Sequence, residues 1–334
     1  MRWFCLTLWK AINMSSPRKT RMFTLAVLGA LVVASVQPAF AQKAYQISSL
    51  ADKFSYPVDG LGAIAANGTL LGYAQGGNAL ITRDSAQPLE DPPGLIGSGY
   101  SGINASLTTV GYVYLEDGSD SVAFVRRADG TFRFLSFPSG AFPYTTGIND
   151  NGDVVGVYYD QDFIGHGFIA DEKGIHSIDI PGATDVQALG INSSGVVVGN
   201  YLDENYDSHS FIMDNKGITE WTIPGARFVY ANCINNNGAI GGLYSDGTNA
   251  HAFVYKAGKV STIDYRNPDL PDSITRNVGG KEVVFAKLSS YPAITGINDR
   301  GDVVGYTSDF YKATDPTIHF ALIFQKSFWG NPLP

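Results

Sequence analysis

Amide and carboxylate side chains recur in a short turn motif that could bind a cation. The clearest copies are Asn149-Asp150-Asn151-Gly152-Asp153 and Asn298-Asp299-Arg300-Gly301-Asp302. Oxygen ligands at this spacing are similar to those of a calcium loop. Two other copies, Asn192-Ser193-Ser194-Gly195 and Asn235-Asn236-Asn237-Gly238, carry no carboxylate. Because tight hairpins also need Asn, Asp and Gly, we interpret the motif as turn chemistry. We expect no cofactor, with calcium as the alternative.

Four of the five histidines share one position of a repeated segment and could form a ring of metal ligands. They are His166, His209, His251 and His319. Equivalent residues converge on one ion only near a symmetry axis, and a metal site needs about three ligands in fixed orientations. We therefore favour a structural role, in which each imidazole hydrogen-bonds a loop backbone, and we predict no metal site.

Motifs of known enzymes are absent from the sequence. There is no Gly-x-Ser-x-Gly elbow, no phosphate-binding glycine loop and no His-Glu-x-x-His. Asp160, Asp203, Glu204 and Asp246 could serve a glycosidase if two of them faced each other. The sequence favours a protein without enzymatic activity and leaves a glycan-active hydrolase or lyase as an alternative.

All these residues belong to a segment that occurs six times, at intervals of 39 to 63 residues. We number the repeats 1 to 6 by their isoleucines: Ile64, Ile103, Ile148, Ile191, Ile234 and Ile297. A glycine follows eight residues after each isoleucine: Gly72, Gly111, Gly156, Gly199, Gly242 and Gly305. Asparagine follows the isoleucine in five repeats, and Ala65 replaces it in repeat 1. These positions are predicted to be structural.

Each repeat reads as four short β-strands separated by turn residues. The strands show period-two alternation or short apolar runs, and no helical periodicity of useful length follows the first 41 residues. Four antiparallel strands per roughly 43-residue repeat are typical of a β-propeller blade. We predict an all-β, six-bladed β-propeller. A seven-bladed propeller and a β-solenoid are the alternatives.

The repeat resembles a known family. Gly147-Ile148-Asn149, continued to Val154-Val155-Gly156, and the tripeptide His251-Ala252-Phe253 are similar to the HAF-type probable extracellular repeat family. The resemblance is strongest from Gly147 to Tyr255. It implies a secreted, bacterial, repeat-built protein and implies no activity.

The two ends of the chain are expected to close the ring. Tyr45 to Leu50 resembles a third strand, and His319 to Phe324 resembles a second strand of the last repeat. Two N-terminal strands would then complete the last blade and leave no open sheet edge. One loop insertion, at about 266–291, accounts for the longest interval. Residues 42–334 are expected to form a single domain.

The N-terminal 41 residues have the pattern of an export signal. Arg18, Lys19 and Arg21 precede an apolar run from Met22 to Val36, and Ala39-Phe40-Ala41 fits a cleavage site. Removal of these residues leaves 18 basic and 31 acidic residues, a net charge of −13. That charge disfavours nucleic acid and anionic lipid as partners. We expect a monomer, exported to the periplasm or the extracellular space, without membrane attachment after cleavage.

Strand parity separates two faces. The Gly-Ile-Asn turns should lie on one face, here called the turn face. The loops after the second strands, which vary in sequence, should lie on the other, here called the variable face. Loops that vary on a fixed scaffold often carry ligand sites. The candidate binding residues are Tyr158, Tyr159, Asp160, Tyr201, Asp203, Tyr206, Tyr244, Asp246, Tyr306, Arg266 and Arg276.

Tyrosine and aspartate side chains of this kind suit a carbohydrate or a peptide. The sequence therefore predicts a binding or scaffolding module. A structural component of the cell surface is a further alternative.

Overall fold

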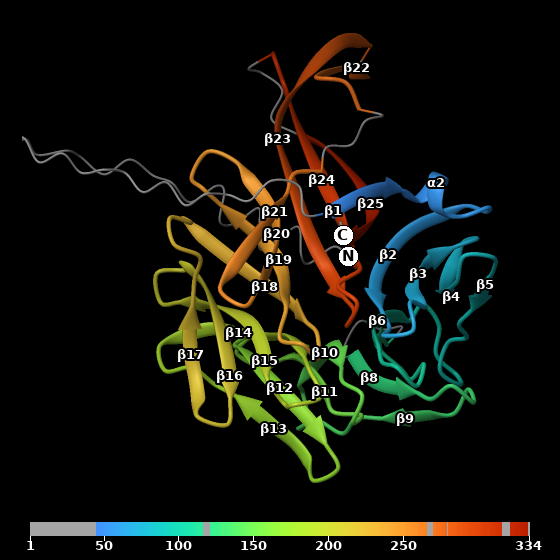
Figure 1. Cartoon of the computed structure of the whole chain (residues 1–334), viewed down its shortest axis with the longest axis vertical. Helices are drawn as coiled ribbons and strands as arrows, with labels where there is room; N and C mark the ends of the chain where they lie inside the picture. Colours follow the sequence, from blue (N-terminus) through green and yellow to red (C-terminus); the bar gives the residue numbers. More distant parts are fainter. Residues whose placement is uncertain (1–44, 116–120, 266–269, 279, 316–320, 333–334) are drawn as a thin grey trace, which may run out of the picture.

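The computed structural model describes residues 45–115, 121–265, 270–278, 280–315 and 321–332 (Figure 1). The predicted signal peptide (1–41), Arg266 and His319 lie outside the described residues. Within them the regular secondary structure is β-strand except for α2 (Leu50–Lys53), a single helical turn. The all-β prediction is confirmed. No helix in these ranges has the length and apolar character needed to cross a membrane.

Repeats 1, 2 and 5 each form a four-stranded antiparallel sheet in chain order. Repeat 1 contains β2 (Val58–Ile64), β3 (Leu70–Ala74), β4 (Gly77–Ile81) and β5 (Ala86–Pro88). Repeat 2 contains β6 (Gly99–Ile103), β7 (Thr109–Tyr114), β8 (Ser121–Arg126) and β9 (Phe132–Phe134). Repeat 5 contains β18 (Phe228–Ile234), β19 (Ile240–Ser245), β20 (Ala250–Lys256) and β21 (Lys259–Ile263).

Repeats 3 and 4 have the same order but are joined at one point. Repeat 3 contains β10 (Phe142–Ile148), β11 (Val154–Tyr159), β12 (Gly165–Asp171) and β13 (Gly174–Ile178). Repeat 4 contains β14 (Ala183–Ile191), β15 (Val197–Asp203), β16 (Ser208–Asp214) and β17 (Gly217–Trp221). A parallel bridge between Gly165 and Asp185 links the two repeats.

Repeat 6 is completed by the N-terminus. Its sheet has the order β1 (Tyr45–Ser49), β25 (Ala321–Pro332), β24 (Val303–Ala313), β23 (Lys281–Ile297) and β22 (Ser273–Val278). Only one N-terminal strand, β1, joins this sheet among the described residues, so the prediction that two strands would complete the last repeat was wrong. The reason is that repeat 6 supplies three of its own inner strands before β1 is added.

The predicted loop insertion at about 266–291 is largely strand where it is described. It contains β22 and the N-terminal part of β23, which extends the sheet beyond the other repeats (Figure 1). Ile274, Val283 and Phe285 are buried there and pack with Tyr311 and Ala313 of β24. Alternating apolar residues thus give the insertion a small core of its own.

The main core lies between consecutive repeats. Val110 and Ala123 of repeat 2 pack with Val154 and Phe168 of repeat 3, for example. Repeat 1 and repeat 6 also touch: Val304 and Trp329 belong to the same apolar cluster as repeat 1 residues, and the Leu61 amide donates to Ser327 Oγ at 3.2 Å. Each repeat therefore buries its apolar faces against its neighbours.

Candidate functional site

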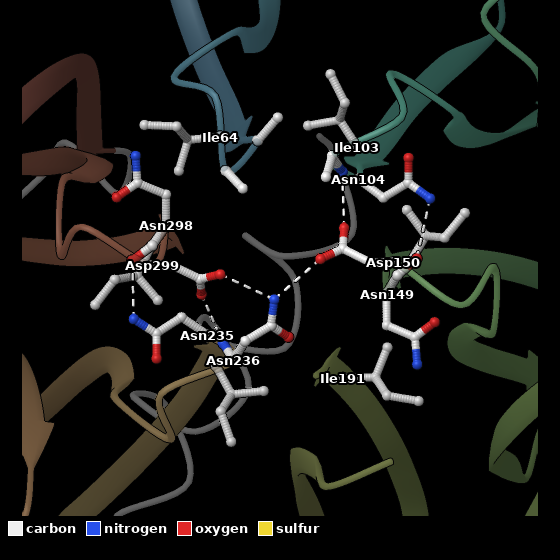
Figure 2. A pocket seen from close by; sticks show the side chains of 16 residues that line it. Ile64, Ile103, Asn104, Asn149, Asp150, Ile191, Asn235, Asn236, Asn298 and Asp299 are labelled. Carbon is white, nitrogen blue, oxygen red and sulfur yellow. Dashed lines mark hydrogen bonds between the residues drawn. The ribbon is translucent and has the colours of Figure 1, made fainter. Parts of the chain in front are cut away.

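The six repeat isoleucines converge on one cavity at the turn face (Figure 2). The cavity has a volume of about 70 Å³ and is also lined by asparagines and aspartates of the turns. Such a volume holds a few water molecules at most. The first strands of all six repeats therefore end beside one another, with polar turn residues around the opening.

Asparagines after the isoleucines form a chain of hydrogen bonds from turn to turn. The Nδ2 donors are Asn104, Asn149, Asn192 and Asn235, and each donates to the backbone oxygen of the next repeat's asparagine, at 3.0, 3.1, 3.3 and 2.8 Å. Each Oδ1 accepts two backbone amides of its own turn. These buried side chains are satisfied within the protein and serve the scaffold.

Two turn carboxylates lie near each other across the opening (Figure 2). Asn236 Nδ2 donates to Asp150 Oδ2 and to Asp299 Oδ2, both at 3.0 Å. Asp150 Oδ1 accepts the Ala105 amide at 2.8 Å, and Asp299 Oδ1 accepts the Asn236 amide at 2.9 Å. Among the described residues, no group of three or more His, Cys, Asp or Glu is placed to hold a metal ion. These carboxylates tie neighbouring turns together, and the calcium alternative stays untested.

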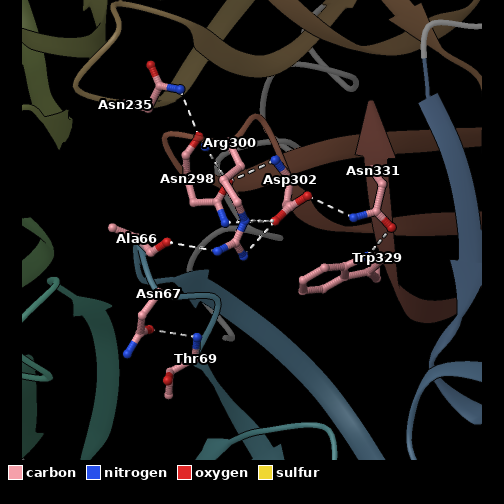
Figure 3. Close-up of polar contacts among 9 residues, drawn as sticks. All are labelled: Ala66, Asn67, Thr69, Asn235, Asn298, Arg300, Asp302, Trp329 and Asn331. Carbon is pink, nitrogen blue, oxygen red and sulfur yellow. Dashed lines mark hydrogen bonds and ion pairs between the residues drawn. The ribbon is translucent and has the colours of Figure 1, made fainter. Parts of the chain in front are cut away.

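Arg300 makes the polar contact from repeat 6 to repeat 1, because the Asn298 side-chain amide donates within its own turn, to Asp302 Oδ2 at 2.9 Å (Figure 3). Its Nη1 donates to Ala66 O at 3.3 Å, and its Nε donates to Asp302 Oδ2 at 2.9 Å. Burial raises the pKa of Asp302, but hydrogen bonds from Asn298, Asn331 and Arg300 outweigh it and hold that pKa below its usual value. An ionised Asp302 thus positions the guanidinium that joins repeat 6 to repeat 1.

The described repeat histidines, His166, His209 and His251, lie near the starts of the third strands, on the variable-face side. His166 stacks on the Tyr158 ring at 5.0 Å, and its Nδ1 and Nε2 lie 2.6 Å from Asp179 and 3.4 Å from Asp160. The equivalent sets are His209 with Tyr201, Asp203 and Glu220, and His251 with Tyr244, Asp246 and Asp264. Each histidine thus connects a loop carboxylate to the fourth strand of its own repeat.

These contacts refine the predicted role of the histidines. The described imidazoles connect two parts of their own repeat, as predicted for a structural role. Their partners, however, are carboxylates and not the loop backbone. Each loop carboxylate, Asp160, Asp203 or Asp246, also accepts two backbone amides of its loop. These amides, with His251, lower the pKa of Asp246 to about 2. Three of the four acids proposed for a glycosidase are therefore engaged in holding the loops, and the fourth, Glu204, is exposed.

The histidine contacts predict a pH-dependent stability. Asp264 and Asp246 raise the pKa of His251 despite partial burial. Burial lowers the pKa of His166, but Asp179 and Asp160 together outweigh it and leave that pKa raised. A raised folded pKa adds stability that is complete below the unfolded value of about 6.5 and disappears as pH rises through the folded pKa. Thermal melts from pH 5 to 9 should show this loss. The His166→Gln/His251→Gln variant should lose less stability across the same range, and an equal loss would contradict the assignment.

The predicted binding tyrosines fall into two groups. Tyr244 is 2% exposed and packs on Phe253, so its predicted role in binding is wrong: it belongs to the core. Tyr158 and Tyr201 are half-buried against their histidines, and Tyr306 is half-buried in β24. The exposed candidates among the described residues are Tyr206, at a loop tip, Arg276, on β22, and Asp246, in the loop after β19.

Tyr159 instead joins an aromatic cluster that the sequence analysis missed. Tyr144 lies at its centre, with ring centroids 4.9 Å from Tyr112, 5.9 Å from Tyr114 and 6.0 Å from Tyr159. All four lie near the variable-face ends of β7, β10 and β11. Tyr114 is 45% exposed and the others are half-buried. Alignment of the residues four positions before each isoleucine, including Tyr144, Gln187 and Tyr230, could have indicated it.

Repeat 4 places an acid and an amide beside this cluster. Gln187 Nε2 donates to Asp185 Oδ2 at 2.9 Å and to the Tyr159 hydroxyl at 3.4 Å. At the same two positions, repeat 3 has Phe142 and Tyr144. Burial raises the pKa of Asp185, and hydrogen bonds from Gln187 and Tyr159 only partly offset it. Asp185 Oδ1 is buried and makes no hydrogen bond within the described residues.

No protein-family model and no curated protein matches the sequence. Solved structures are similar in overall fold. AofleA from Arthrobotrys oligospora is 11% identical over 84% of this chain and 92% of its own, with a TM-score of 0.44. TolB from Acinetobacter baumannii is 12% identical over 84% of this chain and 64% of its own, with a TM-score of 0.44.

The Aleuria aurantia lectin, a six-bladed β-propeller that recognises fucose, is 10% identical over 80% of this chain and 96% of its own, with a TM-score of 0.40. These TM-scores lie below 0.5, so the similarities do not assign this chain a function.

Proposed function

We propose that this chain is an exported six-bladed β-propeller that binds a neutral carbohydrate at its variable face. The observation that carries the ligand proposal is the group formed by Tyr144, Tyr159, Asp185 and Gln187. Aromatic rings can stack on the apolar face of a sugar ring, and a carboxyl beside an amide can exchange hydrogen bonds with neighbouring hydroxyls.

Burial supports the hydrogen-bonding chemistry of this group. It raises the pKa of Tyr144 and of Tyr159 above the usual value for tyrosine. Both hydroxyls therefore stay protonated over the physiological range and can donate. The net charge of −13 for residues 42–334 disfavours an anionic polymer. A neutral glycan is not repelled by this charge, and its binding needs no basic residues.

The architecture and export parts of the proposal have separate support. Six isoleucines around one cavity, and the contact of repeat 1 with repeat 6, support six blades and a closed ring. The signal-like N-terminus and the resemblance to the HAF-type family support export. The domain boundary at residue 42, the monomeric state and the absence of a cofactor belong to the same proposal.

A glycan-binding measurement tests the function. The protein beginning at residue 42 is titrated calorimetrically with neutral β-glucan, mannan, galactan and xylan oligosaccharides. We expect one of these classes to bind. Gln187→Ala and Tyr144→Ala should each weaken that binding at least about tenfold, a loss that corresponds to about 1.4 kcal/mol.

Asn151→Ala is the matched control because Asn151 lies on the turn face, where its Nδ2 donates to Ser193 O at 2.9 Å. It should bind as the parent does. Absence of binding to every oligosaccharide, or equal loss in all three variants, would overturn the proposed function.

A further inference from the structure

The variable face carries the same type of five-residue loop as the turn face. In the turn of repeat 3, the Asn149 amide donates to Asp153 O at 3.0 Å and the Gly152 amide donates to Asn149 O at 3.2 Å. In the loop after β11, the Asp160 amide donates to Ile164 O at 3.1 Å and the Phe163 amide donates to Asp160 O at 3.0 Å. The loop after β15 repeats these bonds between Asp203, Tyr206 and Asp207, each at 3.0 Å.

The fourth residue of this loop has a left-handed backbone, which glycine adopts most easily. Five of the six turns have glycine there: Gly68, Gly152, Gly195, Gly238 and Gly301, with φ from 74° to 91°. Leu107 occupies the position in repeat 2 with φ 58°, and it packs against the core. Its burial accounts for a residue other than glycine.

Phe163 and Tyr206 have the same left-handed backbone, but they do not pack against the core as Leu107 does. Their φ values are 60° and 62°, yet their exposed fractions are 73% and 58%. Neither side chain makes a ring contact or a hydrogen bond to another described residue. A bulky residue with positive φ is a genuine outlier, and strain of this kind is retained where it has a use. Packing and local conformation therefore give no reason for these two aromatic rings.

The two loops lie close to the proposed carbohydrate site. Gly165, directly after the first loop, is bridged to Asp185, and Asp185 is paired in turn with Leu202, directly before the second loop. One strand thus separates the roots of the two loops. Two strand spacings correspond to about 10 Å. Phe163 and Tyr206 consequently stand on either side of the strand that carries Asp185 and Gln187.

We propose that Phe163 and Tyr206 are ligand-stacking residues that extend the site at Asp185 and Gln187 so that it takes a neutral oligosaccharide chain. This inference rests on the proposed function and names the class of ligand more narrowly. Each ring supplies a platform for one sugar unit outside the central one. The histidine contacts of Asp160 and Asp203 keep both platforms rigid, which limits the conformational entropy lost on binding.

Glycine substitution separates a binding role from a structural one. Phe163→Gly and Tyr206→Gly remove the ring and place the favoured residue in the left-handed conformation. The melting temperature of each variant should stay unchanged or rise. The double variant should bind the longest oligosaccharide of the recognised class at least about tenfold more weakly than the parent. Its affinity for the corresponding monosaccharide or disaccharide should change less.

Phe134→Ala is the control for loss of an exposed aromatic ring, because Phe134 lies on β9 and is 47% exposed. It should leave binding unchanged. If the parent protein binds glycan through Gln187 and the double glycine variant binds as tightly, this inference fails while the proposed function stands. A lower melting temperature in the glycine variants would also overturn it, since the rings would then be structural. If the parent protein binds none of the oligosaccharides, both proposals fail.

Discussion

Replacing Gly199 by alanine is expected to destabilise the protein by about 3 kcal/mol, near the upper end of the range for overpacking a well-packed core. A Cβ atom at this position would lie 2.0 Å from Gln187 O and 2.8 Å from the Phe211 ring. The first contact is with backbone of the paired strand, and the second is with a fully buried ring. Neither can move without separating β14 from β15. Urea unfolding followed by circular dichroism measures the change.

Gly77→Ala is the matched control, because a Cβ atom there would meet nothing within 4 Å. It should change the unfolding free energy by less than about 0.5 kcal/mol. A loss below about 1 kcal/mol in Gly199→Ala would show that the pairing of β14 and β15 adapts more easily than this geometry allows.

The same contact explains why the eight-residue spacing could predict the pairing of the first two strands in each repeat. In repeats 2 to 6 each of these glycines lies beneath the ring of a phenylalanine on the third strand, such as Phe124, Phe168 or Phe253. A requirement for glycine at one offset is visible in the sequence because a single strand pairing imposes it. The hairpins, the four strands per repeat and the turn chemistry could all be predicted from such local constraints.

The candidate site could not be predicted in the same way. A bulge between Thr145 and Gly147, and another between Ala188 and Gly190, shift the alternation of the first strands. Strand parity counted from the isoleucine therefore does not tell which side Tyr144 or Gln187 takes. Asp185 fits against repeat 3 because Gly165 has no side chain there, and a Cβ atom on Gly165 would clash with Asp185 Oδ1. This contact between Gly165 and Asp185 occurs between repeats 3 and 4, so it does not appear as a repeated pattern in the sequence.

The contacts of Tyr244 and of the histidines could not be predicted from the repeat positions either. Tyr244 shares a repeat position with Tyr158 and Tyr201, but Phe253 and Thr262 enclose it in repeat 5. The histidines pair with carboxylates on or directly after the fourth strand. These are Asp179, Glu220 and Asp264, at spacings of 13, 11 and 13 residues. Unequal spacing and mixed residue types hide such a contact until the register of the strands is known.

Replacing Asn235 by alanine is expected to destabilise the protein by about 2–3 kcal/mol, the upper range for leaving buried polar groups unsatisfied. The substitution removes the acceptor for the Asn237 and Ala239 amides, at 3.1 and 2.8 Å, and the donor to Asn298 O, at 2.8 Å. Asn235 is only 5% exposed, so water does not readily replace these bonds. Equilibrium unfolding in urea measures the loss, and Asn151→Ala on the same face should cost less than about 1 kcal/mol.

Asn235→Asp separates the two functions of this side chain. A carboxylate keeps the acceptor for both amides but faces Asn298 O, where the amide of Asn235 donates at 2.8 Å. Repulsion from that oxygen and burial should raise the folded pKa of the new carboxyl above the unfolded value of about 3.9. A raised folded pKa means that the variant loses stability relative to the parent as pH rises from about 4, and recovers it at lower pH, where the protonated carboxyl donates to Asn298 O. A difference in stability between variant and parent that is constant from pH 3 to 7 would show that the contact from turn to turn contributes nothing. The asparagine would then matter only within its own turn.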